Sequence, residues 1–172
     1  MATWYLGNIR YQKEDEAGSL KTINEQFLID AISHTEAEAR LYKQIVTGAS
    51  DFSVKRIVPY SLSDLFAYEE GEQWFKTKVV YFSVDERSGK EKKVLNYMLV
   101  NADGIEQALK RVFESMRNFL IPYEVESVSL TKILDVFPYT SEDQEESVPE
   151  NFLPLSEVMD EREKNVSLNN QD

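Results

Sequence analysis

Leu28-Ile29-Asp30-Ala31 returns 71 residues later in the chain as Leu99-Val100-Asn101-Ala102. The same correspondence extends toward both ends of residues 3–139, with an offset of 70 before the first polar turn and 71 after it. Further matches are Trp4-Tyr5 with Trp74-Phe75, Gly18 with Gly89, Arg40 with Arg111, and Asp64-Leu65-Phe66 with Asp135-Val136-Phe137. One register held this far, with its single gap in a turn, indicates an internal duplication.

Each copy of the duplicated unit reads as β-β-α-β. The first two segments are rich in aromatic and β-branched residues, and a polar turn with a glycine separates them, as in a β-hairpin. The predicted elements, first copy and then second, are strands 3–12 and 74–84, return strands 19–31 and 90–101, and closing strands 51–60 and 123–133, with a helix before each closing strand.

The helix of the second copy carries apolar residues at helical spacing. They fall at i, i+3, i+4, i+7, i+8 and i+11, which predicts one buried stripe. Asp103 with Glu106 fits a capping box in the second copy, and Thr35 with Glu38, or Ser33 with Glu36, fits one in the first. The stripe consists of Ile105, Ala108, Leu109, Val112, Phe113 and Met116.

These elements predict an α+β fold. We expect a mainly antiparallel sheet, or two packed sheets, with two helices packed on one face and an acidic C-terminal tail. The expected organisation is a first repeat over 1–66, a linker over 67–73, a second repeat over 74–139, and a largely disordered acidic tail over 140–172.

Composition excludes several chemistries. The 172 residues include no cysteine and one histidine, so a disulfide framework, a thiolate metal site and a two-histidine site within one chain are excluded. No phosphate-binding glycine motif is present. We therefore expect a non-enzymatic protein without a cofactor or metal.

Charge is concentrated near the C-terminus. The net charge is −12, and residues 141–172 contain ten acidic and two basic side chains. Because no apolar run approaches the length needed to cross a bilayer and no signal peptide is visible, we expect a cytoplasmic protein without a membrane segment.

The chain resembles a family of uncharacterised proteins, a domain of unknown function from Bacteroidetes-type bacteria and their phages. The resemblance covers residues 3–139 and implies a bacterial or phage setting and a compact α+β body, with no activity, cofactor or catalytic residue attached. It rests on Trp4-Tyr5, Thr35-Glu-Ala-Glu-Ala-Arg40, Trp74-Phe75-Lys76, Met98-Leu99-Val100 and Asp135-Val136-Phe137-Pro138-Tyr139.

Three sets of polar residues are candidate sites. His34 lies at a helix start, where the dipole disfavours its charged form, so capping or packing is the simpler role. Asp64 and Asp135 end equivalent strands and favour turn capping over a shared metal or proton. Arg40 and Arg111 lie at matching helix positions, where they could pair with a carboxylate, cover the core edge, or bind a phosphate.

Alternation along the first strand of each copy separates two faces. Tyr5, Ile9 and Tyr11, like Phe75, Val79 and Tyr81, are expected to face the helices. The opposite face would be open and would place rings beside cations, the arrangement that binds single-stranded nucleic acid. The candidate contacts are Trp4, Arg10, Trp74, Lys76, Lys78, Lys92 and Lys93.

The leading hypothesis is a single-stranded nucleic-acid-binding accessory protein with an acidic regulatory tail. The alternative is a protein–protein adaptor or inhibitor acting through its acidic surface and tail, with Phe152, Leu153 and Leu155 as anchors. A third hypothesis is a small-molecule site between the repeats with Arg40 and Arg111 as anion anchors. A structural role for Trp4 and Trp74, at the repeat junction or in a homodimer interface, stays open beside these.

Overall fold

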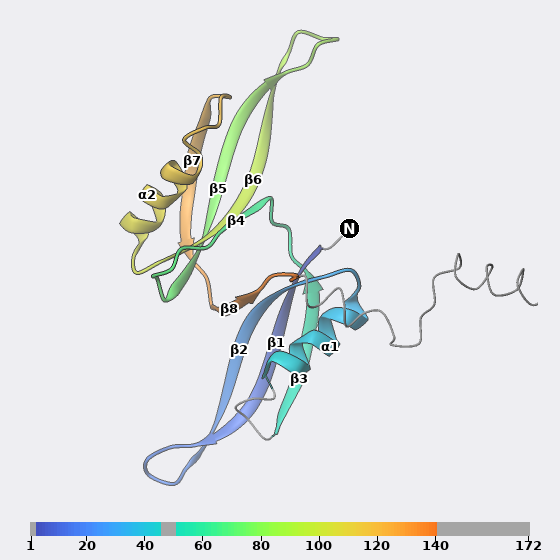
Figure 1. Ribbon diagram of the computed structural model, residues 1–172, viewed down its shortest axis with the longest axis vertical. Coiled ribbons are helices and arrows are strands. Elements are labelled where there is room, and N and C mark those ends of the chain that lie inside the picture. The colour runs from blue at the N-terminus through green and yellow to red at the C-terminus, as the bar shows by residue number, and fades with distance from the viewer. Residues whose placement is uncertain (1–2, 46–50, 141–172) are drawn as a thin grey trace, which may run out of the picture. The chain divides into compact units, whose positions relative to one another are not determined.

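The computed structural model describes residues 3–45 and 51–140 (Figure 1). The described residues up to Pro138 form one compact unit. Within this unit, each half contributes a long hairpin, a helix, a closing strand and a short strand. In order they are β1 (Thr3–Glu14), β2 (Leu20–Ala31), α1 (His34–Ile45), β3 (Phe52–Pro59), β4 (Asp64–Phe66), β5 (Gln73–Val84), β6 (Glu91–Ala102), α2 (Ile105–Ser115), β7 (Tyr123–Leu130) and β8 (Ile133–Phe137).

The strands form two four-stranded sheets. Sheet A has the order β3-β1-β2-β8 and sheet B the order β4-β6-β5-β7. Within each half the hairpin strands and the closing strand pair antiparallel. At one edge of each sheet the pairing is parallel: β8 pairs with β2 in sheet A, and β4 pairs with β6 in sheet B. The structure confirms the predicted α+β fold, and it answers the open question of whether the repeats share one sheet, because each builds its own.

Each sheet nevertheless takes its fourth strand from the other half of the chain. β4 follows β3 of sheet A but pairs with β6 of sheet B, and β8 follows β7 of sheet B but pairs with β2 of sheet A (Figure 1). Matching hydrogen bonds form where the chain leaves each sheet, just after β3 and β7. The Tyr60 N–H donates to the Trp4 carbonyl, and the Thr131 N–H donates to the Trp74 carbonyl. The two repeats are therefore joined by a reciprocal exchange of strands.

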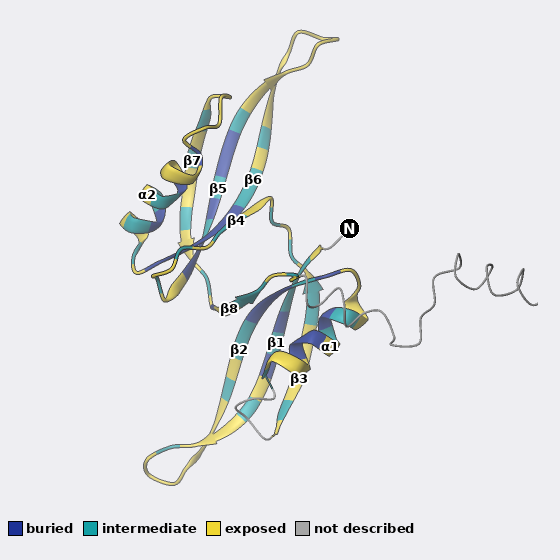
Figure 2. Ribbon diagram, in the orientation of Figure 1, coloured by how far each residue is buried: buried dark blue, intermediate teal, exposed yellow. Residues whose placement is uncertain are grey.

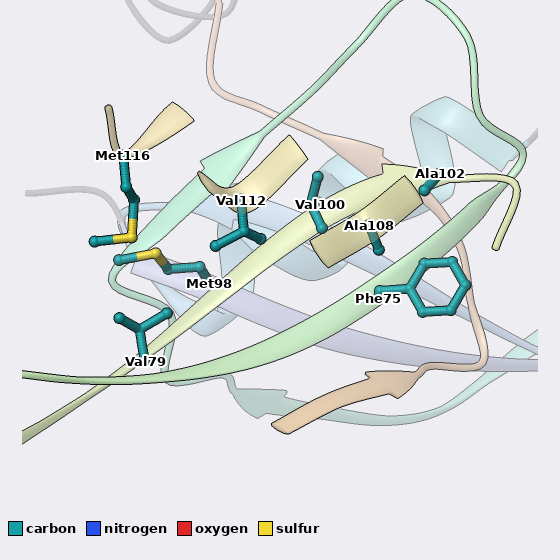
Figure 3. Packing of buried hydrophobic residues seen from close by; sticks show 8 residues of the cluster. All are labelled: Phe75, Val79, Met98, Val100, Ala102, Ala108, Val112 and Met116. Atoms are coloured by element: carbon teal, nitrogen blue, oxygen red, sulfur yellow. The ribbon is translucent and has the colours of Figure 1, made fainter. Parts of the chain in front are cut away.

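Each helix covers one face of its own sheet (Figure 2). In the second half, Phe75, Val79 and Val100 of sheet B pack against Ala108 and Val112 of α2 (Figure 3). In the first half, Ile9, Phe27, Ile29, Ala37 and Leu41 form the equivalent core. This confirms the predicted helix-facing side of β1 and β5. The buried stripe on α2 is narrower than predicted, because Ile105 and Phe113 are exposed.

The helix caps differ between the halves. The N–H of Glu36 bonds to the Ser33 hydroxyl, so the second of the two alternatives for the first helix is the one formed. The N-cap of α2 is Gly104, without a side-chain cap bond, and the predicted capping box of Asp103 with Glu106 is wrong. The Asp103 carboxylate instead accepts from the N–H of Glu72.

A third cluster joins the two halves. Its buried members are Leu28 of β2, Trp74 of β5, Leu99 of β6 and Ile133 of β8, and Trp4, Leu6 and Leu65 are among the partly buried residues packed against it. These side chains lie on the sheet faces that do not carry the helices. We call the face of each sheet that does not carry a helix its second face. The exchange therefore gives the inner part of each second face a core of its own.

Candidate functional site

Trp74 does not lie on an open face. Its side chain is 9% exposed and belongs to the cluster that joins the halves, and Trp4 packs partly buried against the same cluster. The prediction of an exposed ring at position 74 is wrong, because residues from the exchanged strands cover this end of the sheet. Strand alternation separates two faces, but it does not tell whether the second face is covered.

The lysines expected on the second face of sheet B are already engaged there. The Lys76 ammonium lies over two rings, 4.5 Å from the centroids of both Tyr60 and Tyr97. Such cation–π contacts hold the ammonium against protein rather than presenting it to a ligand. Lys92 is exposed but pairs in register with Ser83, which places it on the helix side of the sheet.

Glu126 forms ion pairs with the two remaining cations of that face. Its carboxylate is 2.8 Å from the Lys78 ammonium and also bonds to Lys93. The hydrogen bond from Lys78, followed by that from Lys93, lowers the pKa of Glu126 below its ordinary value. The same bond to Glu126 raises the pKa of Lys78. Lys78 and Lys93 on this face of sheet B thus share one acidic partner.

The second face of sheet A has a different character beyond the shared cluster. Register pairs place Asn8 between Gln26 of β2 and Arg56 of β3, and Arg10 between Asn24 and Ser53. Residues paired in register point to the same side of a sheet. The Arg10 Nε donates to the Asn24 side-chain oxygen at 3.0 Å, which orients the guanidinium on this face.

Lys55 belongs to the same face because of a β-bulge. The register between β1 and β3 shifts at Asn8/Ile9, and the register between β5 and β7 shifts at the equivalent Lys78/Val79. In each half the shift adds one residue to the closing strand, Lys55 in β3 and Glu126 in β7. The contacts of Glu126 with Lys78 and Lys93 show that the bulge residue points to the second face.

We call these residues the amide–cation face: Asn8, Arg10, Asn24, Gln26, Lys55 and Arg56. Within the part of the chain that the structure describes, Arg10, Lys55 and Arg56 form no ion pair. The acidic side chains on this side of β1 and β2 are Glu14, at the hairpin end, and Asp30, beside Trp4 at the junction. Three exposed cations with neighbouring amides can contact an anionic, hydrogen-bonding ligand.

Sequence reasoning found Arg10 but missed Lys55, Arg56 and the amides as a group. In an unbroken strand, the adjacent residues Lys55 and Arg56 would point to opposite faces. The bulge shifts the alternation of β3 by one residue and brings both to the same face. The adjacent basic pair was the one available signal.

Arg40 and Arg111 serve the backbone. Arg40 bonds to the Asp30 carbonyl at the end of β2 and, at 3.1 Å, to the Pro138 carbonyl just after β8. Arg111 donates at 2.6 Å to the equivalent Asn101 carbonyl and at 2.6 Å to the Glu70 carbonyl after β4. Each arginine thus connects the end of its own return strand to the chain that follows an exchanged strand.

His34 and the paired aspartates have local partners. The His34 ring lies edge-on to Tyr5, with centroids 6.4 Å apart, in agreement with a packing role. The Asp64 and Asp135 side chains each accept the N–H of the following residue at 2.8 Å. Over residues 3–45 and 51–140, no group of three or more His, Cys, Asp or Glu side chains is placed to hold a metal.

The predicted tail anchors Phe152, Leu153 and Leu155 lie outside the described residues. None of the helices in the described ranges is long and apolar enough to cross a membrane.

Residues 3–139 match a protein family described as a domain of unknown function, DUF4494. The chain belongs to this family. No curated protein and no solved structure shows significant similarity to the chain. Membership confirms the resemblance to a domain-of-unknown-function family over the predicted range, and the repeat of DUF4494 seen here is the β-β-α-β unit with its exchanged fourth strand.

Proposed function

We propose that the protein is a non-enzymatic binding protein for single-stranded nucleic acid, and that the amide–cation face of sheet A is its binding surface. The observation that carries this proposal is the set of three exposed cations, Arg10, Lys55 and Arg56, without an acidic partner among the described residues. Cations spaced along a sheet follow a phosphate backbone, and side-chain amides can donate to and accept from base edges.

The duplication supplies an internal comparison. At the positions of Asn8, Lys55 and Arg56, sheet B has Lys78, Glu126 and Ser127. There the bulge residue is an acid that binds the neighbouring lysines, whereas in sheet A it is a cation with no such partner. Two copies of one framework have therefore diverged at the charge of a single bulge, which supports a ligand-binding role for sheet A alone.

Trp4 extends this surface toward the junction. It lies on the same side of β1 as Asn8 and Arg10 and is partly exposed. A ring at the end of a cationic strip offers one stacking position for a base. The family resemblance implies a bacterial or phage setting, and the proposal is of a cytoplasmic accessory protein.

The test is fluorescence anisotropy of a labelled single-stranded oligonucleotide at several salt concentrations. The double variant Lys55→Glu with Arg56→Ser gives sheet A the residues that sheet B carries at these positions. We expect weaker binding. The slope of the logarithm of the binding constant against the logarithm of the salt concentration should become shallower by about 0.7 per lost phosphate contact. Lys78→Asn, which gives sheet B the residue of sheet A, is the matched control and should leave affinity unchanged.

A chain ending at residue 140 adds a second arm. Without the ten acidic side chains of residues 141–172, repulsion of phosphate falls, so we expect tighter binding. Equal affinity of the wild type and the Lys55/Arg56 variant, or a larger loss with Lys78→Asn, would contradict the proposal.

A further inference from the structure

A large hollow lies on the helix side of sheet A, beyond the C-terminal end of α1. It has a volume of about 1130 Å³, and polar and charged residues line it together with the aromatic side chains Tyr11, Phe27, Phe52 and Phe137. The Phe27 and Phe137 rings stack with centroids 5.8 Å apart, so β8, the strand from the other half, forms part of its wall. We call this site the aromatic hollow, and it adjoins the amide–cation face proposed for nucleic acid, with which it shares Arg10.

The second repeat fills the equivalent place with a side chain of its own. Tyr81 and Tyr123 are register partners at the end of the β5–β7 ladder, as Tyr11 and Phe52 are in β1–β3. Phe119 lies edge-on to both tyrosines, with centroids 5.6 Å from Tyr81 and 6.0 Å from Tyr123. The framework at this position therefore accommodates an aromatic ring.

The described residues of the first repeat keep the surrounding rings and include no counterpart of the inserted one. Tyr42 contacts Phe52 with centroids 5.2 Å apart, as Phe113 contacts Tyr123 at 6.3 Å. Among the described residues, no ring occupies the place of Phe119 between Tyr11 and Phe52. Phe119 corresponds to Gly48, and residues 46–50, which lie outside the described ones, read Val-Thr-Gly-Ala-Ser without an aromatic residue.

The rim of the hollow is acidic. Glu14, Glu25, Asp51 and Asp135 line it, against Lys13 and Arg10, and Arg10 is turned toward Asn24. The Tyr11 hydroxyl donates to Glu25 at 2.7 Å, and this bond raises the pKa of Tyr11. At the positions of Glu25 and Asp51 the second repeat has Asn96 and Pro122, so these two acids are particular to the open hollow.

We propose that the aromatic hollow binds a partner peptide that presents an aromatic side chain next to a basic residue. The aromatic ring takes the place that Phe119 takes in the second repeat, and the basic residue lies against the carboxylates of the rim. The chain's own Arg117-Asn118-Phe119 has this composition and is the template for the ligand. Aromatic burial supplies most of the affinity, and the exposed carboxylates add selectivity for a cation.

The experiment is a titration of the isotopically labelled full chain with the capped peptide Arg-Asn-Phe-Leu-Ile, the sequence of residues 117–121, followed by backbone amide chemical shifts. We expect saturable shifts at Tyr11, Glu25 and Phe52 and none at Tyr81 and Tyr123. Alanine in place of the peptide's phenylalanine should weaken binding at least about tenfold. Citrulline in place of its arginine should weaken it about two- to fivefold.

Two protein variants test the site itself. Phe52→Leu removes the receiving ring and should abolish the shifts, while Tyr123→Leu makes the matched change in the second repeat and should preserve them. Glu25→Gln keeps the shape of the rim and leaves the core residue Phe52 in place. It should reduce the preference for arginine over citrulline, since three carboxylates remain on the rim.

Four outcomes would overturn the proposal. One is an absence of shifts at millimolar peptide, and another is equal binding of the alanine peptide. The third is self-association of the chain that Phe52→Leu abolishes, since this would assign the hollow to a second copy. A single-stranded oligonucleotide that shifts the same amides would assign the hollow to nucleic acid instead. Failure of the nucleic-acid proposal leaves this result unaffected, because Lys55→Glu with Arg56→Ser does not alter the ring pair.

Discussion

The Arg40 guanidinium on α1 donates a hydrogen bond of 3.1 Å to the carbonyl oxygen of Pro138, 98 positions later in the chain. Its other terminal nitrogen bonds to the Asp30 carbonyl, at the end of the strand that β8 joins. One buried side chain thus connects the helix of the first half, the second strand of its sheet and the strand that arrives from the second half. A planar guanidinium can reach carbonyls in two directions, which a lysine ammonium on a flexible stem does less well.

Replacing Arg40 by methionine should destabilise the protein by about 2–3 kcal/mol, because buried carbonyls lose a charged donor. Arg40 is 8% exposed, so water does not readily replace the guanidinium. The measurement is urea unfolding. Lys110→Met, on the exposed side of α2, is the control and should change stability by less than about 0.5 kcal/mol. Equal stability of the two variants would show that the arginine does not hold the exchanged strand.

Gly7 and Leu41 are matched in size. A Cβ built on Gly7 would lie 2.7 Å from a methyl carbon of Leu41, and the equivalent pair in the second half is Thr77 with the smaller Val112. Gly7→Ala should therefore cost about 1–3 kcal/mol through overpacking. Leu41→Val in the same chain should recover part of this loss. A double-mutant cycle by urea unfolding measures the coupling, and additive effects of the two changes would contradict the predicted contact.

Asp85 holds the β5–β6 turn and should contribute to the acid limb of stability. Its side chain accepts the N–H groups of Ser88 and Arg87, and these bonds lower its pKa below the ordinary value of 3.8. A lowered folded pKa means that the contribution is complete above the unfolded pKa and is lost as the pH falls through the folded one. The stability gap between the wild type and Asp85→Asn should therefore be constant near neutral pH and shrink below about pH 4. Urea unfolding across this pH range measures the gap, and a gap that widens on acidification would contradict the assignment.

The sequence predicted the features that repeat locally. The hairpins, the helices and the helix-facing residues Tyr5, Ile9 and Tyr11 follow from spacing within one copy, and the structure has them in place. Gly18 and Gly89 have φ values of 80° and 65°, a conformation that glycine adopts without strain, in agreement with their predicted turns. Duplication made these predictions stronger, because each could be checked against a second copy.

The exchange of strands was not accessible in this way. Asp64-Leu65-Phe66 and Asp135-Val136-Phe137 are short, and their composition does not tell which of two equivalent sheet edges each one joins. The burial of Trp74 depends on that exchange, since Leu65 and Ile133 of the exchanged strands belong to the cluster around it. The error about Trp74 therefore came from a pairing between segments far apart in the chain, whereas Lys55 and Arg56 were missed because of the bulge in β3.

The exchange of β4 and β8 also determines when each sheet can be completed during synthesis of the chain. When the ribosome has completed β1, β2, α1 and β3, sheet A still lacks its edge strand, which is encoded last among the described strands as Ile133–Phe137. β4 emerges next and has to wait for β6, the strand it joins. The first half of the nascent chain therefore presents an unfinished sheet edge until the second half has emerged, and both halves complete their sheets at nearly the same moment.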